Sequence, residues 1–189
     1  MPYPLSVATI NIDGGRTFDR VLPFLNRLSP DVLCVQEVYE VDLPRFDPFF
    51  ATHRYVPMTR LAKDGQMESI GFALFCKTTV SLLSSEVFHY VGNKGPPVDL
   101  VPEPMEARRE TEKRALLLAS IEKQDVLYVV GTTHFSWVPK GEADDYQRRD
   151  VRLLMDKVLE KEDIVLCGDF NAPRGREIFD YIAVRLRDN

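Results

Sequence analysis

Short apolar runs separated by turn-forming residues recur along the chain. Leu5–Ile12 is the first run, and Asp13-Gly14-Gly15 follows it with residues that favour a tight turn. Val32–Val38 and Ile164–Gly168 have the same character. Runs of this length, rich in β-branched residues, are typical of buried strands. Further strands are expected at Ile70–Cys76, Val80–Tyr90, Arg114–Ile121 and Val126–Thr132.

Other segments carry apolar residues at helical spacing. In Phe18–Leu28 the apolar positions recur at three- and four-residue intervals, and Thr17 precedes them as an N-cap residue. Pro23 removes a hydrogen bond inside that segment, so we expect a kinked helix there. An amphipathic helix is expected over Gln147–Val158, and a last helix over Ile178–Leu186.

The order of these elements predicts an α/β fold. Strand–helix–strand stretches alternate with hairpins, a mixture that favours helices packed outside two sheets. The chain has 189 residues, of which 44% are apolar and 28% charged, as in an ordinary globular protein. We therefore expect a single domain spanning residues 1–189. The segment Gly92–Pro104, with four prolines and two glycines, is expected to be a long surface loop.

Charge and cysteine content narrow the function classes. The net charge is −5 and the pI about 5.3, which argues against tight non-specific binding to nucleic acid, because such binding needs many Lys/Arg–phosphate contacts. There is no run of 18 apolar residues, and the N-terminus lacks the pattern of a signal peptide. Cys34, Cys76 and Cys167 lie in apolar runs without metal-ligand spacing, so we expect three buried, reduced thiols in a cytoplasmic protein with no membrane span.

Polar residues end two of the expected strands in pairs. Asn11 and Asp13 end the first strand, and Asp169 and Asn171 end the last one. Residues two apart in a strand project from the same face, so each pair is expected to point in one direction. Either pair alone has an ordinary explanation, because Asn and Asp are frequent turn formers.

Glu37 and His134 complete the set of polar residues at strand ends. Glu37 lies at the end of the Val32–Val38 run, and His134 follows Val126–Thr132. Alone, Glu37 is typical of an edge charge and His134 of a hydrogen-bonded structural histidine. In open α/β sheets, however, binding sites gather at one end of the strands. Together, carboxylates, amides and an imidazole at that end indicate a site for a hard cation and a phosphate.

Four segments that contain these residues resemble the motifs of the endonuclease/exonuclease/phosphatase superfamily of metal-dependent phosphoesterases. They occur in the family's order and at similar spacing: Ala8-Thr-Ile-Asn-Ile-Asp-Gly14, Asp31-Val-Leu-Cys-Val-Gln-Glu-Val38, Gly131-Thr-Thr-His-Phe-Ser-Trp137 and Leu166-Cys-Gly-Asp-Phe-Asn-Ala-Pro173. Each motif is weak by itself, whereas four in order make a strong resemblance. The resemblance implies a four-layer α/β/β/α sandwich and a hydrolase acting on phosphate esters.

The resemblance does not extend to the family's last motif. Members carry a late aspartate and a terminal Ser-Asp-His-like sequence, and neither is found before Asn189. The histidines, His53, His89 and His134, all lie earlier in the chain. We therefore expect a sandwich that is incomplete at its C-terminal end. The corresponding functional alternative is a catalytically silent binding module or an inactive fragment.

The resemblance also implies a cofactor. Glu37 would be the principal ligand of a Mg²⁺ or Mn²⁺ ion, with Asn11 and Asp13 nearby. Such an ion prefers oxygen ligands and keeps several waters, so one or two protein oxygens are sufficient. It would withdraw charge from the phosphoryl oxygens.

Catalytic roles follow from the same resemblance. Asp169 would orient or deprotonate the attacking water. Asn171 and His134 would donate hydrogen bonds to the phosphoryl group as charge develops on it. Arg114 lies where many members carry a phosphate-contacting arginine and would supply a fixed positive charge.

The sequence indicates the type of reaction more closely than it indicates the substrate. The tetrapeptide Asn11–Gly14 is similar to that of apurinic endonucleases and favours a phosphodiester in nucleic acid, at a nucleic-acid end or in an adduct. The acidic composition favours a small or lipid-linked phosphate, cleaved by a phosphatase or phosphodiesterase. Trp137 and Lys140 are candidate substrate-loop residues, and Trp137 either stacks on a base or caps the core. The alternating charges of Glu106–Arg114 predict a solvated stretch.

Overall fold

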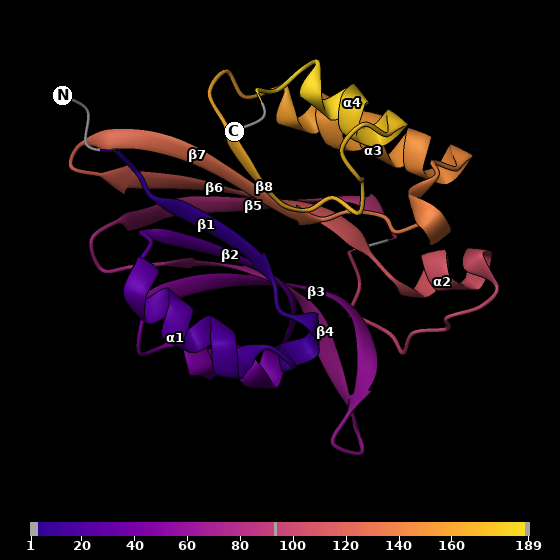
Figure 1. Cartoon of the computed structure of the whole chain (residues 1–189), viewed down its shortest axis with the longest axis horizontal. Helices are drawn as coiled ribbons and strands as arrows, with labels where there is room; N and C mark the ends of the chain where they lie inside the picture. Colours follow the sequence, from indigo (N-terminus) through magenta and orange to yellow (C-terminus); the bar gives the residue numbers. More distant parts are fainter. Residues whose placement is uncertain (1–3, 93, 188–189) are drawn as a thin grey trace.

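The computed structural model describes residues 4–92 and 94–187, and two four-stranded sheets form its centre (Figure 1). The first sheet has the order β1-β2-β4-β3 and the second the order β5-β6-β7-β8. The strands are β1 (Val7–Asn11), β2 (Val32–Tyr39), β3 (Thr52–Lys63), β4 (Gln66–Cys76), β5 (Ser81–Val91), β6 (Arg114–Lys123), β7 (Val126–His134) and β8 (Val165–Asp169). Residues 1–3, Asn93 of the expected Gly92–Pro104 loop, and residues 188–189 lie outside the described part of the chain.

Each sheet has one pair of parallel strands at its edge. β1 runs parallel to β2, and β7 runs parallel to β8 with His134 beside Asp169. Parallel neighbours need a crossover connection, which α1 (Phe18–Leu28) and α3 (Asp145–Val158) supply. β1 also contacts β8 across the two sheets. The carboxyl ends of all four strands therefore come together at one place.

Three apolar clusters hold the layers together. Cys34 of β2 and Leu117 of β6 belong to the cluster between the sheets. Their neighbours in sequence point the other way: Leu33 packs in the cluster under α1, and Leu116 in the cluster under α3 and α4 (Glu177–Ala183). The order of layers is thus α1, first sheet, second sheet, then α3 with α4 (Figure 1). This confirms the expected α/β/β/α arrangement.

One strand, β3, and one short α-helix were not predicted from the sequence. β3 pairs with β4 along its whole length, and β4 begins at Gln66 rather than at Ile70. β3 lies at the edge of its sheet and contains Pro57 at a shift of register, so its apolar pattern is weak. The short helix α2 (Met105–Thr111) buries none of its residues fully, and so it lacks the apolar stripe by which a helix is usually recognised.

Three further details bear on the sequence predictions. α1 continues through Pro23 and ends at Ser29, whose φ of 52° is left-handed. Cys34 and Cys76 are buried free thiols, but Cys167 in β8 is only half-buried, so the expectation of three buried thiols is wrong for that residue. None of the helices in the described residues is long and apolar enough to cross a membrane.

Candidate active site

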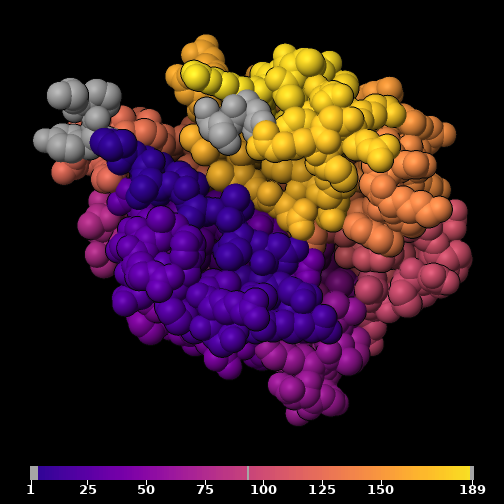
Figure 2. Space-filling view, in the orientation of Figure 1, coloured from indigo at the N-terminus to yellow at the C-terminus, as the bar shows by residue number. Residues whose placement is uncertain are grey.

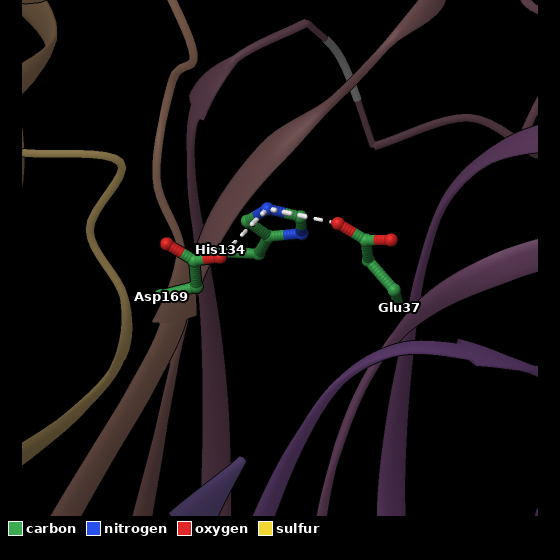
Figure 3. Close-up of side chains that lie close together, drawn as sticks. All are labelled: Glu37, His134 and Asp169. Carbon is green, nitrogen blue, oxygen red and sulfur yellow. Dashed lines mark ion pairs between the residues drawn. The ribbon is translucent and has the colours of Figure 1, made fainter. Parts of the chain in front are cut away.

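Three titratable side chains converge where the carboxyl ends of β2, β7 and β8 meet. Glu37, His134 and Asp169 each offer a ligand atom, and these atoms lie within 4.8 Å of one another. The Nε2 atom of His134 is 3.8 Å from Glu37 Oε1 and 3.9 Å from Asp169 Oδ2. Figure 3 shows the imidazole between the two carboxylates, which come from different sheets.

Asn11 joins the two carboxylates from the end of β1. Its Nδ2 donates hydrogen bonds to Glu37 Oε1 and to Asp169 Oδ2, both at 2.9 Å. Its Oδ1 accepts the backbone N–H of Asp13 at 2.9 Å, which fixes the orientation of the amide. Asn11 therefore holds one oxygen of each carboxylate near the same point, and it presents N–H groups to the site rather than a ligand oxygen.

A β-bulge sets the direction of the Glu37 side chain. The register of β2 against β4 shifts between Gln36 and Val38, so Glu37 is the extra residue. Its φ is 56°, in the left-handed region that non-glycine residues rarely occupy. On β4, Gly71 lies so close to β3 that a Cβ there would be 2.0 Å from the Val56 carbonyl oxygen. The left-handed φ of Glu37 is a strained backbone conformation, and such strain clusters at functional sites, which supports a functional role for Glu37.

His134 is neutral in this setting. Burial lowers the pKa of its imidazole, and the charge of Arg114 lowers it further. The negative charge of Asp169 acts in the opposite direction, and the resulting pKa is about 3. Its Nδ1 atom is buried and has no hydrogen-bond partner among the described residues. Because two carboxylates lie beside Nε2, that nitrogen is the favoured position for the ring proton. His134 can then donate it to an oxygen in the site.

Asp13 and Asn171 lie beyond the ends of their strands. Asp13 begins a 3-10 turn with φ 49°, and its carboxylate, 59% exposed, pairs with Arg16 at 3.4 Å. Asn171 has φ 48°, and its Nδ2 donates to the Phe135 carbonyl at 2.9 Å. The expectation that each pair projects like alternate residues of a strand is therefore wrong, because both strands end two residues earlier. Asp13 also stands outside the group formed by the two carboxylates and the imidazole.

A buried cluster of ion pairs lies beside His134. Arg114, with a side chain only 4% exposed, donates to the His134 carbonyl at 3.1 Å and pairs with Glu112 at 2.8 Å. Arg108 of α2 also pairs with Glu112 at 2.8 Å, and its guanidinium lies 5.1 Å from the centre of the Trp137 ring. The expected solvated stretch is therefore wrong, because these charges are paired with one another. The i,i+4 spacing of Arg108 and Glu112 is the sequence signal that indicates such a pair.

Two hollows open beside Asn171. A cavity of about 270 Å³ reaches Glu37 and His134 between the β3–β4 hairpin and α2. An open groove of about 610 Å³ runs along the ends of β1 and β8, on the face where the indigo and yellow surfaces meet in Figure 2. Trp137, predicted as a substrate residue, lines both hollows, and Lys140 lines the groove. Both residues thus lie within reach of the candidate site.

The donor atoms of the site suit a hard divalent cation. Glu37 and Asp169 supply carboxylate oxygens, the ligand type that Mg²⁺ and Mn²⁺ prefer. Their side chains are 34% and 30% exposed, so water has access to the remaining coordination positions. The residues present therefore fit a divalent cation, and Glu37 is the residue that would hold it, within reach of Asp169.

The site residues lie within a segment that matches a known protein family. The model of the endonuclease/exonuclease/phosphatase family matches residues 8–186 of the chain. This range includes every residue of the site described above. No curated protein matches the chain.

Solved structures share this fold at low sequence identity. The human nocturnin catalytic domain with bound sulfate is 17% identical with a TM-score of 0.63, and the match covers 86% of this chain and 59% of that one. A mannosyl-6-phosphatase of Bacteroides thetaiotaomicron is 16% identical with a TM-score of 0.67, and the match covers 96% of this chain and 71% of that one. D. rerio TDP2 complexed with single-strand DNA product is 19% identical with a TM-score of 0.59, and the match covers 89% of this chain and 61% of that one. The chain thus spans less than two thirds of nocturnin's domain and of TDP2.

Proposed function

The chain belongs to the endonuclease/exonuclease/phosphatase family, a family of phosphoesterases, and on this premise we propose that it hydrolyses a phosphate ester with the help of Mg²⁺ or Mn²⁺. The observation that carries the proposal is the approach of Glu37, His134 and Asp169 to within 4.8 Å of one another. They come from three strands and two sheets, so separate roles as turn formers or edge charges do not explain their meeting. Two carboxylates and a neutral imidazole donor suit a phosphoryl group with its cation.

Each residue of the site has a distinct role in this proposal. Glu37 would hold the cation, which when bound withdraws electron density from the phosphoryl group. Asp169, on the opposite side of the imidazole, would accept a proton from the attacking water (Figure 3). His134 would donate its Nε2–H to a phosphoryl oxygen as negative charge develops there. Asn11 would keep the two carboxylates in place through its paired N–H groups.

Asn171 and Arg114 would assist from the edge of the site. The Asn171 amide donates one hydrogen bond to the Phe135 carbonyl, and an amide has a second N–H for a phosphoryl oxygen. Arg114 is held by the His134 carbonyl and by Glu112, so it contributes a fixed positive charge rather than a mobile contact. Burial of the imidazole lowers the pKa of His134, and the charge of Arg114 lowers it further, which keeps the ring neutral as a hydrogen-bond donor.

The arginines around the site favour one of the two substrate classes. Arg108 and Arg114 are both paired with Glu112. Arg109 is paired with the buried Asp150 at 2.8 Å. Binding of a long polyanion relies on many Lys and Arg charges that are free to neutralise phosphates. Asp150 neutralises Arg109, and Arg108 and Arg114 share the charge of Glu112, so only one net positive charge remains among the three. The pairs support a small or lipid-linked phosphate as the substrate over a phosphodiester within nucleic acid.

Hydrolysis of bis(p-nitrophenyl) phosphate by this 189-residue chain tests the proposed function. We expect turnover with Mg²⁺ or Mn²⁺, none with EDTA, and its loss in Glu37→Gln and Asp169→Asn. Asp13→Asn is the matched control, because that carboxylate is close in sequence but exposed and outside the group. Turnover no greater than that of Asp169→Asn would instead support the catalytically silent binding module.

Salt dependence separates the two substrate classes. Cleavage of an oligonucleotide should fall steeply between 50 and 200 mM salt if binding depends on many phosphate contacts, by about 10³-fold or more. Hydrolysis of a small ester should change little over the same range. A steep salt dependence together with faster oligonucleotide cleavage would reverse the preference stated here.

A further inference from the structure

The cavity of about 270 Å³ beside His134 has two walls of different chemistry. One wall is charged and carries Arg108, Glu112 and Arg114. The other is apolar and is built by the β3–β4 hairpin, the loop before α2 and the segment after β7. Its side chains are those of Met58, Leu61, Ile70, Leu100 and Trp137. Such a combination suits a ligand that is apolar at one end and anionic at the other.

The two walls meet at the candidate site. Glu37, His134 and Asn171 also line the cavity. A phosphoryl group in contact with these residues therefore has the cavity next to it, and a group esterified to that phosphate can extend into it. On the charged wall two arginines face one glutamate, so the wall carries one net positive charge and does not repel the phosphate.

The size of the cavity limits what the apolar wall can cover. A protein cavity of about 150 Å³ lined by Leu, Ile and Phe accommodates a benzene ring. A volume of about 270 Å³ is therefore enough for one aromatic ring with a small substituent. Trp137 lines the cavity and is 43% exposed, with the Arg108 guanidinium 5.1 Å from its ring centre. Its exposed part offers an aromatic surface against which such a ring can pack.

We propose that this cavity binds an aromatic ring esterified to the phosphate, so that the protein prefers aryl phosphate esters to esters of small alcohols. This inference rests on the proposed function, because it takes the phosphate to lie against Glu37, His134 and Asn171. It adds the chemical class of the group beside the phosphate, which the site residues alone do not define.

Binding of phenyl phosphate and methyl phosphate in the presence of Mg²⁺, measured by titration calorimetry, tests the preference. The two ligands carry the same phosphate and differ in the ring alone. Burial of the ring against the apolar wall should make phenyl phosphate bind about tenfold more tightly. Equal affinities in the wild-type protein would overturn the inference.

Two cavity-filling variants connect the preference to this cavity. Leu61→Trp fills it from the β3–β4 hairpin, and Leu100→Trp fills it from the loop before α2. Each should reduce the affinity ratio of the two ligands to about one. Ala62→Trp is the matched control, because Ala62 is exposed and neighbours Leu61 in the same strand, and it should keep the ratio. A ratio unchanged in both filling variants would place the ring elsewhere and overturn the inference.

The same measurements separate failure of this inference from failure of the proposed function. Metal-dependent hydrolysis of bis(p-nitrophenyl) phosphate without a preference for phenyl phosphate would refute the aromatic subsite and leave the phosphoesterase intact. Absence of hydrolysis together with absence of binding of either monoester would refute both.

Discussion

Replacing Glu112 by glutamine removes the carboxylate that joins two arginines beside the candidate site. The Glu112 side chain is 12% exposed and lies 2.8 Å from both Arg108 and Arg114. Burial raises the pKa of this carboxyl group, but the charge of Arg114 and the hydrogen bond from Arg108 outweigh that effect and lower it to about 2. Relative to an ordinary value of 4.5, this corresponds to about 3 kcal/mol of stabilisation at pH 7.

The pH dependence of this stabilisation has a defined sign. Because the pKa of Glu112 is lower in the folded than in the unfolded state, the stabilisation is present above pH 4.5 and is lost as the pH falls toward 2. At pH 3, about 1 kcal/mol should remain. Glu112→Gln should therefore lower the free energy of unfolding by about 3 kcal/mol at pH 7 and by about 1 kcal/mol at pH 3.

Urea unfolding followed by circular dichroism measures the loss of unfolding free energy at pH 7 and at pH 3. Glu110→Gln is the matched control, since Glu110 is exposed and lies two residues before Glu112, on α2, and we expect it to change stability by less than about 0.5 kcal/mol. A loss for Glu112→Gln that is equal at pH 7 and pH 3 would refute the electrostatic reasoning. So would a loss at pH 7 no larger than that of the control.

Other contacts around the site can be tested by single changes. Asp150→Asn should destabilise the protein by about 3–5 kcal/mol in urea unfolding, because its fully buried carboxylate pairs with Arg109; a loss below about 1 kcal/mol would contradict this. Gly168→Ala should cost at least about 2 kcal/mol in the same assay, because φ is 143° and a Cβ would lie 2.1 Å from the Thr133 carbonyl oxygen. Asn11→Ala should weaken Mg²⁺ affinity by about 10- to 100-fold in titration calorimetry, since both carboxylates lose their shared donor, and an unchanged affinity would rule out that role.

The fold could be predicted wherever burial leaves a continuous apolar run. β2 and β6 are buried on both faces along most of their length, between a sheet and a helix layer, so each contains a continuous apolar run that is easy to recognise, Val32–Val35 and Ala115–Ala119. β3 lies at an edge, contains Pro57 and buries only Val56, Met58 and Thr59 fully, so its sequence gives little indication of a strand. The charged helix α2 is held by ion pairs instead of an apolar face, which composition alone does not distinguish from a solvated stretch.

The site was predictable to the extent that it depends on strand ends. Parallel strands bring their carboxyl ends to one edge, so the approach of Asn11 to Glu37 in the first sheet, and of His134 to Asp169 in the second, follows from the order of the elements. The bulge that orients Glu37 depends on the register of β2 against β4, a contact between distant segments that a local pattern does not contain. For the same reason the sequence did not predict that Asn11 would donate hydrogen bonds to both carboxylates.

The geometry of the site depends on the distance between the two sheets more than on either sheet alone. Glu37 belongs to the first sheet and Asp169 to the second, and Asn11 bridges them at 2.9 Å on each side. A second hydrogen bond joins the two sheets next to this site: Gln36 Nε2 donates to Thr132 Oγ1 at 3.4 Å, and both residues are buried. Two carboxylates this close repel each other unless a donor or a cation lies between them. The unfolded chain does not hold them together, so a cation held by Glu37 in the folded chain would add its binding free energy to that of joining the sheets. The residues that perform the proposed chemistry therefore also help to close the sandwich at the end where they meet.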